Sequence, residues 1–144
     1  MDLQRFQNYM NTAENFNLYN GLTFPVVEEG HCVCKVTLTQ NGRNPQGVAH
    51  GSLLFAMCDA VTGVAAASTG RSMLTQSADI HYLRPVSEGV LTAESRVIRI
   101  GRRTGLIAAE VRDEENRLLC TGEFSVWFTG DDVVLPGDEG CTWH

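Results

Sequence analysis

Asp59 is the residue in this chain whose surroundings point most strongly to chemistry. It carries the only full charge between Arg43 and Arg71, inside the segment HGSLLFAMCDAVTGVAAAS, which otherwise has the composition of a buried helix. The positions three and four residues away on a helix hold no basic side chain, so its own helix offers no ion pair. Burial makes a carboxylate a stronger base, and such groups concentrate at functional sites. The sequence therefore predicts a catalytic carboxylate; the alternative is an exposed Asp on a solvent-facing stripe.

The start of the same helix is suited to bind a developing negative charge. The first N–H groups of a helix are unpaired and lie at the positive end of its dipole, and Gly51 lets a carbonyl approach the backbone closely. Gly51 and Asp59 lie about 12 Å apart along the axis at 1.5 Å per residue. One helix cannot direct both groups at one carbonyl, whereas two antiparallel helices related by a two-fold axis can. The spacing predicts a homodimer with shared sites.

Composition limits the other classes of function. The chain has 144 residues, 43% hydrophobic and 19% charged, which predicts one globular domain over residues 1–144. The net charge of -6 argues against a nucleic-acid partner that needs a broad basic surface. No stretch is long and apolar enough to cross a membrane, and the N-terminus lacks a signal-peptide pattern, so a cytoplasmic location is expected.

The cysteines and histidines show no metal-binding pattern. Five cysteines are an odd number without CxxC spacing, and the four histidines form no HxxxH or HExxH motif. Cys32 and Cys34 would lie on one face of a strand, about 7 Å apart, which is too far for a regular disulfide. We therefore expect reduced, mostly buried thiols and no metal site.

Hydrophobic periodicity and turn residues predict the elements that position Asp59. A short amphipathic helix over 2–11 is followed by an extended segment over 18–27, where Pro25 indicates an edge position. Apolar and polar residues alternate from His31 to Thr39, as in a half-buried strand. Further strands are predicted at about 73–83, 89–100, 104–112 and 117–128, and the acidic segment GDDVVLPGDEG is expected to be a loosely ordered end.

These elements predict an α+β fold. The short connections SEG, GRR and DEEN favour an antiparallel, meandering sheet after the long helix. The helix shows one apolar face, at Leu53, Ala56, Met57, Ala60 and Val64. One apolar helix and a sheet of five or six strands can bury each other only if the sheet curls around the helix. That arrangement is the hotdog fold, with a core over about 18–129.

Two segments resemble a known family. NPQGVAHGSLLFAMCDAVTGVA is similar to the signature of phenylacetate-degradation-type (PaaI-type) hotdog acyl-CoA thioesterases, and the resemblance continues into QSADIHYLRPVSEG and the GRRTG turn. It implies that Asn44 and the Gly51 amide bind the thioester carbonyl. It also implies that Asp59 is the nucleophile or general base and that Ser77 positions the attacking water. Ser52 departs from the pattern by replacing the family's second glycine.

The resemblance implies hydrolysis of an aryl-acetyl-CoA or medium-chain acyl-CoA, without a metal or redox cofactor, by dimers that pair into a homotetramer. The phosphates of coenzyme A suit guanidinium groups, so the candidate ligands are Arg71, Arg84, Arg102 and Arg103, with the Arg102–Arg103 turn favoured. His50 is a second candidate substrate contact, although capping the helix is the preferred role. Asn44 has the alternative role of a turn former.

Two other functions are compatible with these residues. A hotdog enoyl-CoA hydratase or dehydratase would share proton transfer between a His and a carboxylate, for which His50 and Asp59 are available. The chain lacks the His-Phe-Pro type of loop and the Asp-x-Asn-Pro-x-His type of motif of such enzymes. The third reading is a non-catalytic acyl-CoA-binding hotdog domain, which the Ser52 departure favours.

Overall fold

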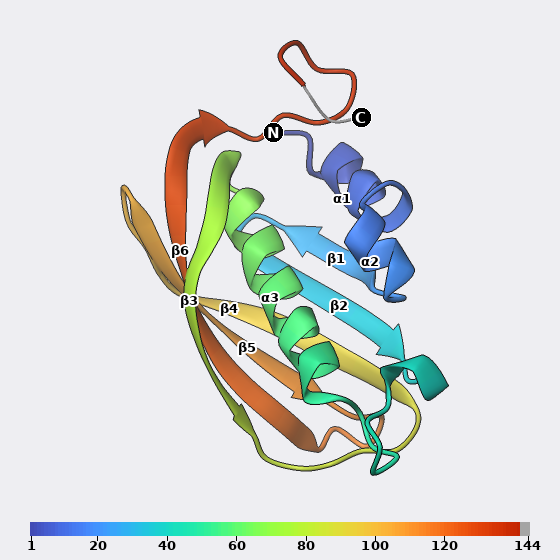
Figure 1. Cartoon of the computed structure of the whole chain (residues 1–144). Coiled ribbons are helices and arrows are strands. Elements are labelled where there is room, and N and C mark those ends of the chain that lie inside the picture. Colours follow the sequence, from blue (N-terminus) through green and yellow to red (C-terminus); the bar gives the residue numbers. More distant parts are fainter. Residues whose placement is uncertain (142–144) are drawn as a thin grey trace.

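A curved antiparallel sheet wraps around one long helix in the computed structural model, which describes residues 1–141 (Figure 1). The elements in chain order are α1 (Leu3–Thr12), α2 (Asn15–Tyr19), β1 (Thr23–Glu28), β2 (His31–Thr37), the 3-10 turn η1 (Gln40–Gly42), α3 (Gly51–Ala67), β3 (Arg71–Tyr82), β4 (Val90–Ile100), β5 (Thr104–Arg112) and β6 (Leu118–Asp132). The six strands lie in the order β1-β2-β4-β5-β6-β3. The predicted hotdog architecture and the strand positions after α3 are confirmed.

The helix α3 packs along the concave face of the sheet and contacts every strand. Its most deeply buried residues are Met57, Cys58, Val61, Thr62, Ala65 and Ala66. The predicted apolar face was therefore partly wrong, because Leu53, Ala56 and Ala60 remain partly exposed. The less buried side of α3 also carries apolar residues, including the exposed Phe55, so apolar composition alone does not mark the buried face of this helix.

The two edges of the sheet differ. At the β1 edge, Pro25 lies within a short strand whose pairing with β2 is shifted between Thr23 and Val26. Both features protect an edge from pairing with another chain. The β3 edge is twelve residues long, is paired only with β6 and carries mostly exposed side chains. The predicted edge position of Pro25 is confirmed, and β3 is the open edge.

The segment before β1 differs from the prediction. Residues 18–27 were expected to be extended throughout, but Leu18 and Tyr19 belong to the short helix α2. The Glu14 carboxylate caps that helix by accepting a hydrogen bond from the Asn17 N–H. A helix of five residues is too short to show helical periodicity, which is why the apolar pattern alone predicted a strand.

The acidic end of the described chain is ordered, contrary to the prediction. β6 continues to Asp132, and the following Leu135 is buried against the core. Asp138 then forms an ion pair with Arg5 of α1 and accepts a hydrogen bond from the Leu135 N–H. These two contacts hold the pKa of Asp138 below its ordinary value, with the backbone hydrogen bond as the larger cause. The segment therefore ties α1 to the end of the sheet.

Candidate active site

Asp59 and Thr75 form the first part of the candidate site. The Asp59 carboxylate is half-buried on α3, and the Thr75 hydroxyl on β3 donates a hydrogen bond of 2.7 Å to its Oδ1. Within residues 1–141, Asp59 forms no ion pair. One carboxylate oxygen is thus fixed by a neutral donor while the group keeps access to solvent. Such a carboxylate can accept a proton or attack a carbonyl carbon.

The N-terminus of α3 forms the second part. His50 is the N-cap, and its Nδ1 accepts a hydrogen bond of 3.0 Å from the Ser52 N–H. The N–H groups of Leu53 and Leu54 bond to the His50 carbonyl. In the described structure, Gly51 is therefore left with the unpaired N–H of the first helical turn. This amide is available to a developing oxyanion.

The position of His50 agrees with the capping role. Because Nδ1 accepts a hydrogen bond, the proton of the neutral ring is assigned to Nε2. Nε2 belongs to an exposed side chain and can still donate to a ligand. The contact between His50 and substrate stays a prediction.

Asn44 holds the loop that leads into α3. Its side-chain Oδ1 accepts hydrogen bonds from the N–H groups of Gln46 and Val48, and its own N–H donates to the Val48 carbonyl. These contacts fix the orientation of the side-chain amide, whose Nδ2 makes no hydrogen bond within the described residues. Asn44 is thus a turn former with a spare donor, and its contact with the thioester carbonyl stays a prediction.

Ser77 is placed differently from Thr75. A bulge interrupts the pairing of β3 with β6 between these two residues, and Ser77 pairs with Ser125. Because the bulge breaks the alternation of side chains, the two hydroxyls do not occupy equivalent positions on the strand. Within the chain, Thr75 and not Ser77 contacts Asp59. A role for Ser77 in positioning water stays a prediction.

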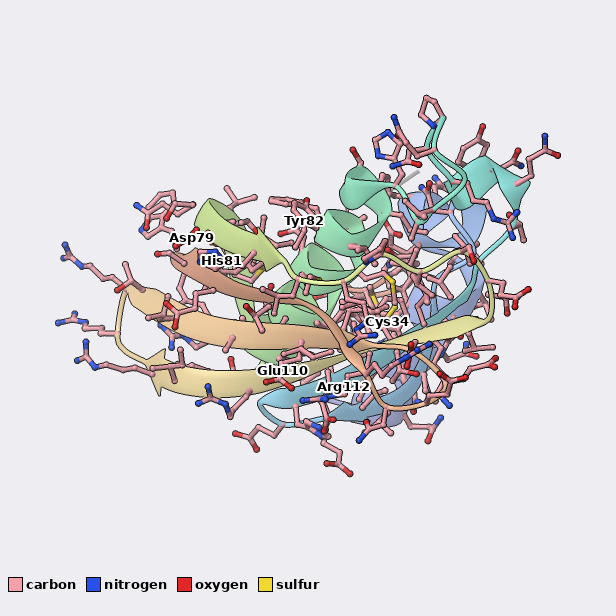
Figure 2. All side chains as sticks on the ribbon, turned by 90° about the horizontal axis from the view of Figure 1, so that it is seen from below. Cys34, Asp79, His81, Tyr82, Glu110 and Arg112 are labelled. Carbon is pink, nitrogen blue, oxygen red and sulfur yellow. The ribbon has the colours of Figure 1, made fainter. Side chains whose placement is uncertain are left out.

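Tyr82 is a residue that the sequence analysis missed. Its hydroxyl donates a hydrogen bond of 2.9 Å to the Gly51 carbonyl, and a Cβ added at Gly51 would meet the ring at 3.3 Å. Figure 2 shows Tyr82 beside α3, whereas Glu110 and Arg112 lie on the opposite face of the sheet. The signal was present in β3, where Ala78, Ile80 and Tyr82 alternate on the side that faces the helix.

The candidate phosphate ligands separate into two places. Arg102 and Arg103 are exposed in the β4–β5 turn and line a hollow of about 520 Å³ together with Arg71. The Arg71 guanidinium donates to the carbonyls of Gly101 and Arg102 and stacks on the Phe128 ring at 3.6 Å. Arg71 therefore holds the turn that presents the other two guanidinium groups.

Arg84 lies at a different position in the fold. Its backbone N–H bonds to the Leu119 carbonyl just beyond the end of β3, and its side chain is exposed. The structure thus brings Arg102 and Arg103 together and leaves Arg84 apart from them in the fold.

The buried thiols are unsuited to nucleophilic chemistry. All five cysteines are free, and Cys32, Cys34, Cys58 and Cys120 are buried. Burial raises the pKa of Cys34 to about 12, so this thiol stays protonated at neutral pH.

Residues 1–141 contain no group of three His, Cys, Asp or Glu side chains arranged to hold a metal ion. In the same range, no helix has the length and hydropathy needed to span a bilayer.

Residues 46–120, which include Gly51, Asp59, Thr75 and Tyr82, match the family model of the thioesterase superfamily. The chain belongs to the thioesterase superfamily. This superfamily member is 29% identical over 101 residues to the Escherichia coli acyl-coenzyme A thioesterase PaaI, covering 69% of this chain and 72% of that protein. It is also 23% identical over 109 residues to the 1,4-dihydroxy-2-naphthoyl-CoA hydrolase of Listeria monocytogenes, covering 74% and 89%.

Solved structures agree with this assignment. The E. coli PaaI protein has the same fold, with a TM-score of 0.86 at 22% identity over 92% of this chain and 96% of that one. A hypothetical thioesterase from Streptococcus pneumoniae, solved with coenzyme A, has a TM-score of 0.76 at 27% identity, covering 80% and 94%. The predicted resemblance to PaaI-type thioesterases is confirmed.

The Streptococcus protein adds one observation about spacing. Two further structures of it carry single replacements by Ala, one of an Asp and one of a Thr, at positions sixteen residues apart. Asp59 and Thr75 of this chain are separated by the same sixteen residues. The pair that the structure brings into contact here therefore has the spacing of the pair chosen for replacement there.

Proposed function

We propose that this thioesterase-superfamily protein hydrolyses an acyl-CoA, with an aryl-acetyl or medium-chain acyl group, to the free acid and coenzyme A. The observation that carries the proposal is the pairing of two features on one helix: the unpaired Gly51 N–H at its start and the Asp59–Thr75 hydrogen bond eight residues further on. The names of the E. coli and Listeria relatives support the substrate class.

The proposed chemistry assigns one task to each group. The Gly51 N–H and the spare amide N–H of Asn44 bind the thioester oxygen and stabilise the negative charge that develops on it. Asp59 acts either as the base that takes a proton from the attacking water or as the nucleophile that attacks the carbonyl carbon. In the second case it forms a mixed anhydride with the acyl group, and water then hydrolyses this anhydride to the free acid and restores the Asp59 carboxylate. Thr75 holds the carboxylate, and the coenzyme A thiolate leaves. The protein groups suffice for this sequence of steps, so no cofactor is invoked.

Gly51 and Asp59 can act on the same thioester only if two subunits share the site. Gly51 and Asp59 of one helix lie about 12 Å apart along the axis, at 1.5 Å per residue. The open edge of β3 supports a two-fold partner, because antiparallel pairing of two β3 strands would continue the sheet and set the two α3 helices side by side. The Gly51 of one protomer would then face the Asp59 of its partner. The homotetramer and the cytoplasmic location stay predictions.

The geometry does not favour the hydratase alternative. The Nδ1 of His50 is engaged in capping α3, which leaves only Nε2 for proton transfer, and no contact within residues 1–141 pairs His50 with Asp59. A panel of acyl-CoAs separates the functions in one experiment. Thiol release detected with a thiol reagent indicates hydrolysis, loss of enoyl absorbance indicates hydration, and saturable binding with neither indicates a binding domain.

Subunit mixing tests the shared site. Asp59→Ala and Asn44→Ala are each expected to be inactive, and the two are unfolded together and refolded so that subunits reassort. In a mixed dimer both lesions fall into one site, and the other site keeps an intact Asn44 opposite an intact Asp59. Half of the dimers are mixed under random pairing, so about a quarter of wild-type activity returns. If mass spectrometry confirms exchange and activity does not exceed that of the separate variants, the site lies within one subunit.

A further inference from the structure

The peptide groups on both sides of Gly51 are held by hydrogen bonds. In the group before it, the His50 carbonyl accepts from two N–H groups of the first turn of α3. In the group after it, the Ser52 N–H donates to His50 Nδ1 at 3.0 Å, and the Gly51 carbonyl accepts from the Tyr82 hydroxyl at 2.9 Å. Of these contacts, the one from Tyr82 comes from the sheet and the others come from the helix and its cap.

A glycine at this position needs such a restraint. Without a Cβ, Gly51 lets a thioester carbonyl approach its N–H, but it also has access to a wider range of φ and ψ than any other residue. A displacement of about 1 Å in a catalytic group can cost a large part of its effect. A hydrogen bond from a fixed strand to the Gly51 carbonyl restricts these angles, so the neighbouring N–H keeps one direction before substrate binds.

Tyr82 is well supported for this task. It is the last residue of β3 and pairs with Cys120 of β6, and the N–H of the following residue, Leu83, bonds to the Leu119 carbonyl at 2.8 Å. Figure 2 shows its side chain beside α3. The ring lies directly against Gly51, since a Cβ added there would meet it at 3.3 Å. The strand therefore presents the hydroxyl from a fixed position.

The fold does not depend on this hydroxyl to attach the start of α3. The chain beyond β3 holds the preceding loop at two other points, because the Val86 carbonyl accepts from the Ala49 N–H at 2.7 Å and the Ser87 carbonyl accepts from the Arg43 side chain at 2.8 Å. The Tyr82 side chain is also 52% exposed. Removal of its hydroxyl alone should therefore change the alignment of Gly51 more than the stability of the protein.

We propose that Tyr82 is a positioning residue for thioester hydrolysis, because its hydroxyl holds the Gly51 carbonyl and thereby aligns the Gly51 N–H with the developing oxyanion. The proposal rests on the thioesterase function proposed above. Tyr82 acts through Gly51 and has no contact with substrate in this role. Since the negative charge on the thioester oxygen grows in the transition state, loss of alignment lowers kcat and leaves KM nearly constant.

Tyr82→Phe tests this role, because it keeps the ring and removes the hydroxyl. We expect kcat for the best acyl-CoA of the panel to fall about threefold to tenfold, with KM changed less than twofold and Tm nearly unchanged. Tyr9→Phe is the matched control, since Tyr9 lies on α1, which packs on β1 and α2, and its hydroxyl makes no hydrogen bond within residues 1–141. The control should match wild type. Wild-type kcat in Tyr82→Phe, or a loss that appears only in KM, would refute the proposal.

A double-mutant cycle identifies the group through which Tyr82 acts. The Cβ of Gly51→Ala would meet the ring and displace the hydroxyl from the carbonyl, so this variant should already lack the restraint. We expect Gly51→Ala/Tyr82→Phe to have the same kcat as Gly51→Ala alone. If the two losses multiply instead, Tyr82 acts through a group other than Gly51 and the proposal is wrong.

A substrate analogue excludes direct contact between Tyr82 and substrate. S-hexyl-coenzyme A has a methylene group in place of the thioester carbonyl, so its Kd should be equal for wild type and Tyr82→Phe. Weaker binding to the variant would make Tyr82 a substrate contact and overturn the positioning role. If wild type releases no thiol from any acyl-CoA, the proposed function fails and this role fails with it. If wild type is active and Tyr82→Phe is equally active, the positioning role alone is refuted.

Discussion

Replacement of Thr75 tests the role assigned to its hydrogen bond with Asp59. Thr75→Val removes the hydroxyl and keeps a β-branched side chain that suits the strand. A hydrogen bond to a charged group is worth about 1.5–3 kcal/mol, but Thr75 is exposed, which favours the lower end. Since about 1.4 kcal/mol corresponds to a tenfold change in rate, kcat should fall about tenfold to thirtyfold.

The assay for this prediction is thiol release from the best acyl-CoA of the panel, with KM and thermal stability measured on the same samples. Thr75→Ser is the matched control, because it keeps the hydroxyl and should stay within about threefold of wild type. Stability should be nearly unchanged in both variants, since the position is exposed. Wild-type turnover by Thr75→Val would refute the role of the hydroxyl, and an equal loss in Thr75→Ser would assign the effect to the shape of the strand.

Three other changes give distinct results. Gly51→Ala should lower kcat about tenfold with little loss of stability, because its Cβ would meet an exposed tyrosine ring at 3.3 Å and shift the helix start; unchanged kcat would contradict this. Arg102→Ala/Arg103→Ala should raise KM for acyl-CoA about tenfold at low salt and less at high salt, with kcat unchanged. An unchanged KM would show that the phosphates of coenzyme A bind elsewhere on the protein. The hydrogen bond with Glu94 raises the pKa of His31 above its ordinary value of 6.5. Protonated His31 therefore stabilises the fold below pH 6.5, and this stabilisation is lost as the pH rises through the pKa of His31 in the folded protein. The Tm of the wild type should fall slightly between pH 6 and 8, and this fall should be absent in His31→Gln.

The strands and α3 were predictable because their signals are local. The alternation around Cys32 and Cys34 reports a half-buried strand directly, and the turn residues fix where the chain reverses. The face of α3 was less predictable, since alanines such as Ala56 are apolar but too small to determine which side is buried. The helix α2 was missed because five residues do not complete enough turns to show a period.

The site residues on α3 were predictable from the sequence, whereas the β3 residue that contacts Asp59 was not. Asp59 and Gly51 stand out by charge and by position at the helix start. Thr75 could not be distinguished from Ser77, because the choice depends on a bulge in β3 that appears only when the strand pairs with β6. Tyr82 was missed for a similar reason, since its contact with Gly51 joins residues that are thirty-one positions apart.

The most direct test of the account is the turnover of Asp59→Asn on an acyl-CoA that the wild type hydrolyses. The substitution keeps the shape of the side chain and removes its ability to act as base or nucleophile. We predict that kcat falls at least about a hundredfold, while KM, the circular dichroism spectrum and the oligomeric mass stay near those of the wild type. Turnover close to that of the wild type would show that Asp59 is a structural residue and would contradict the proposed mechanism.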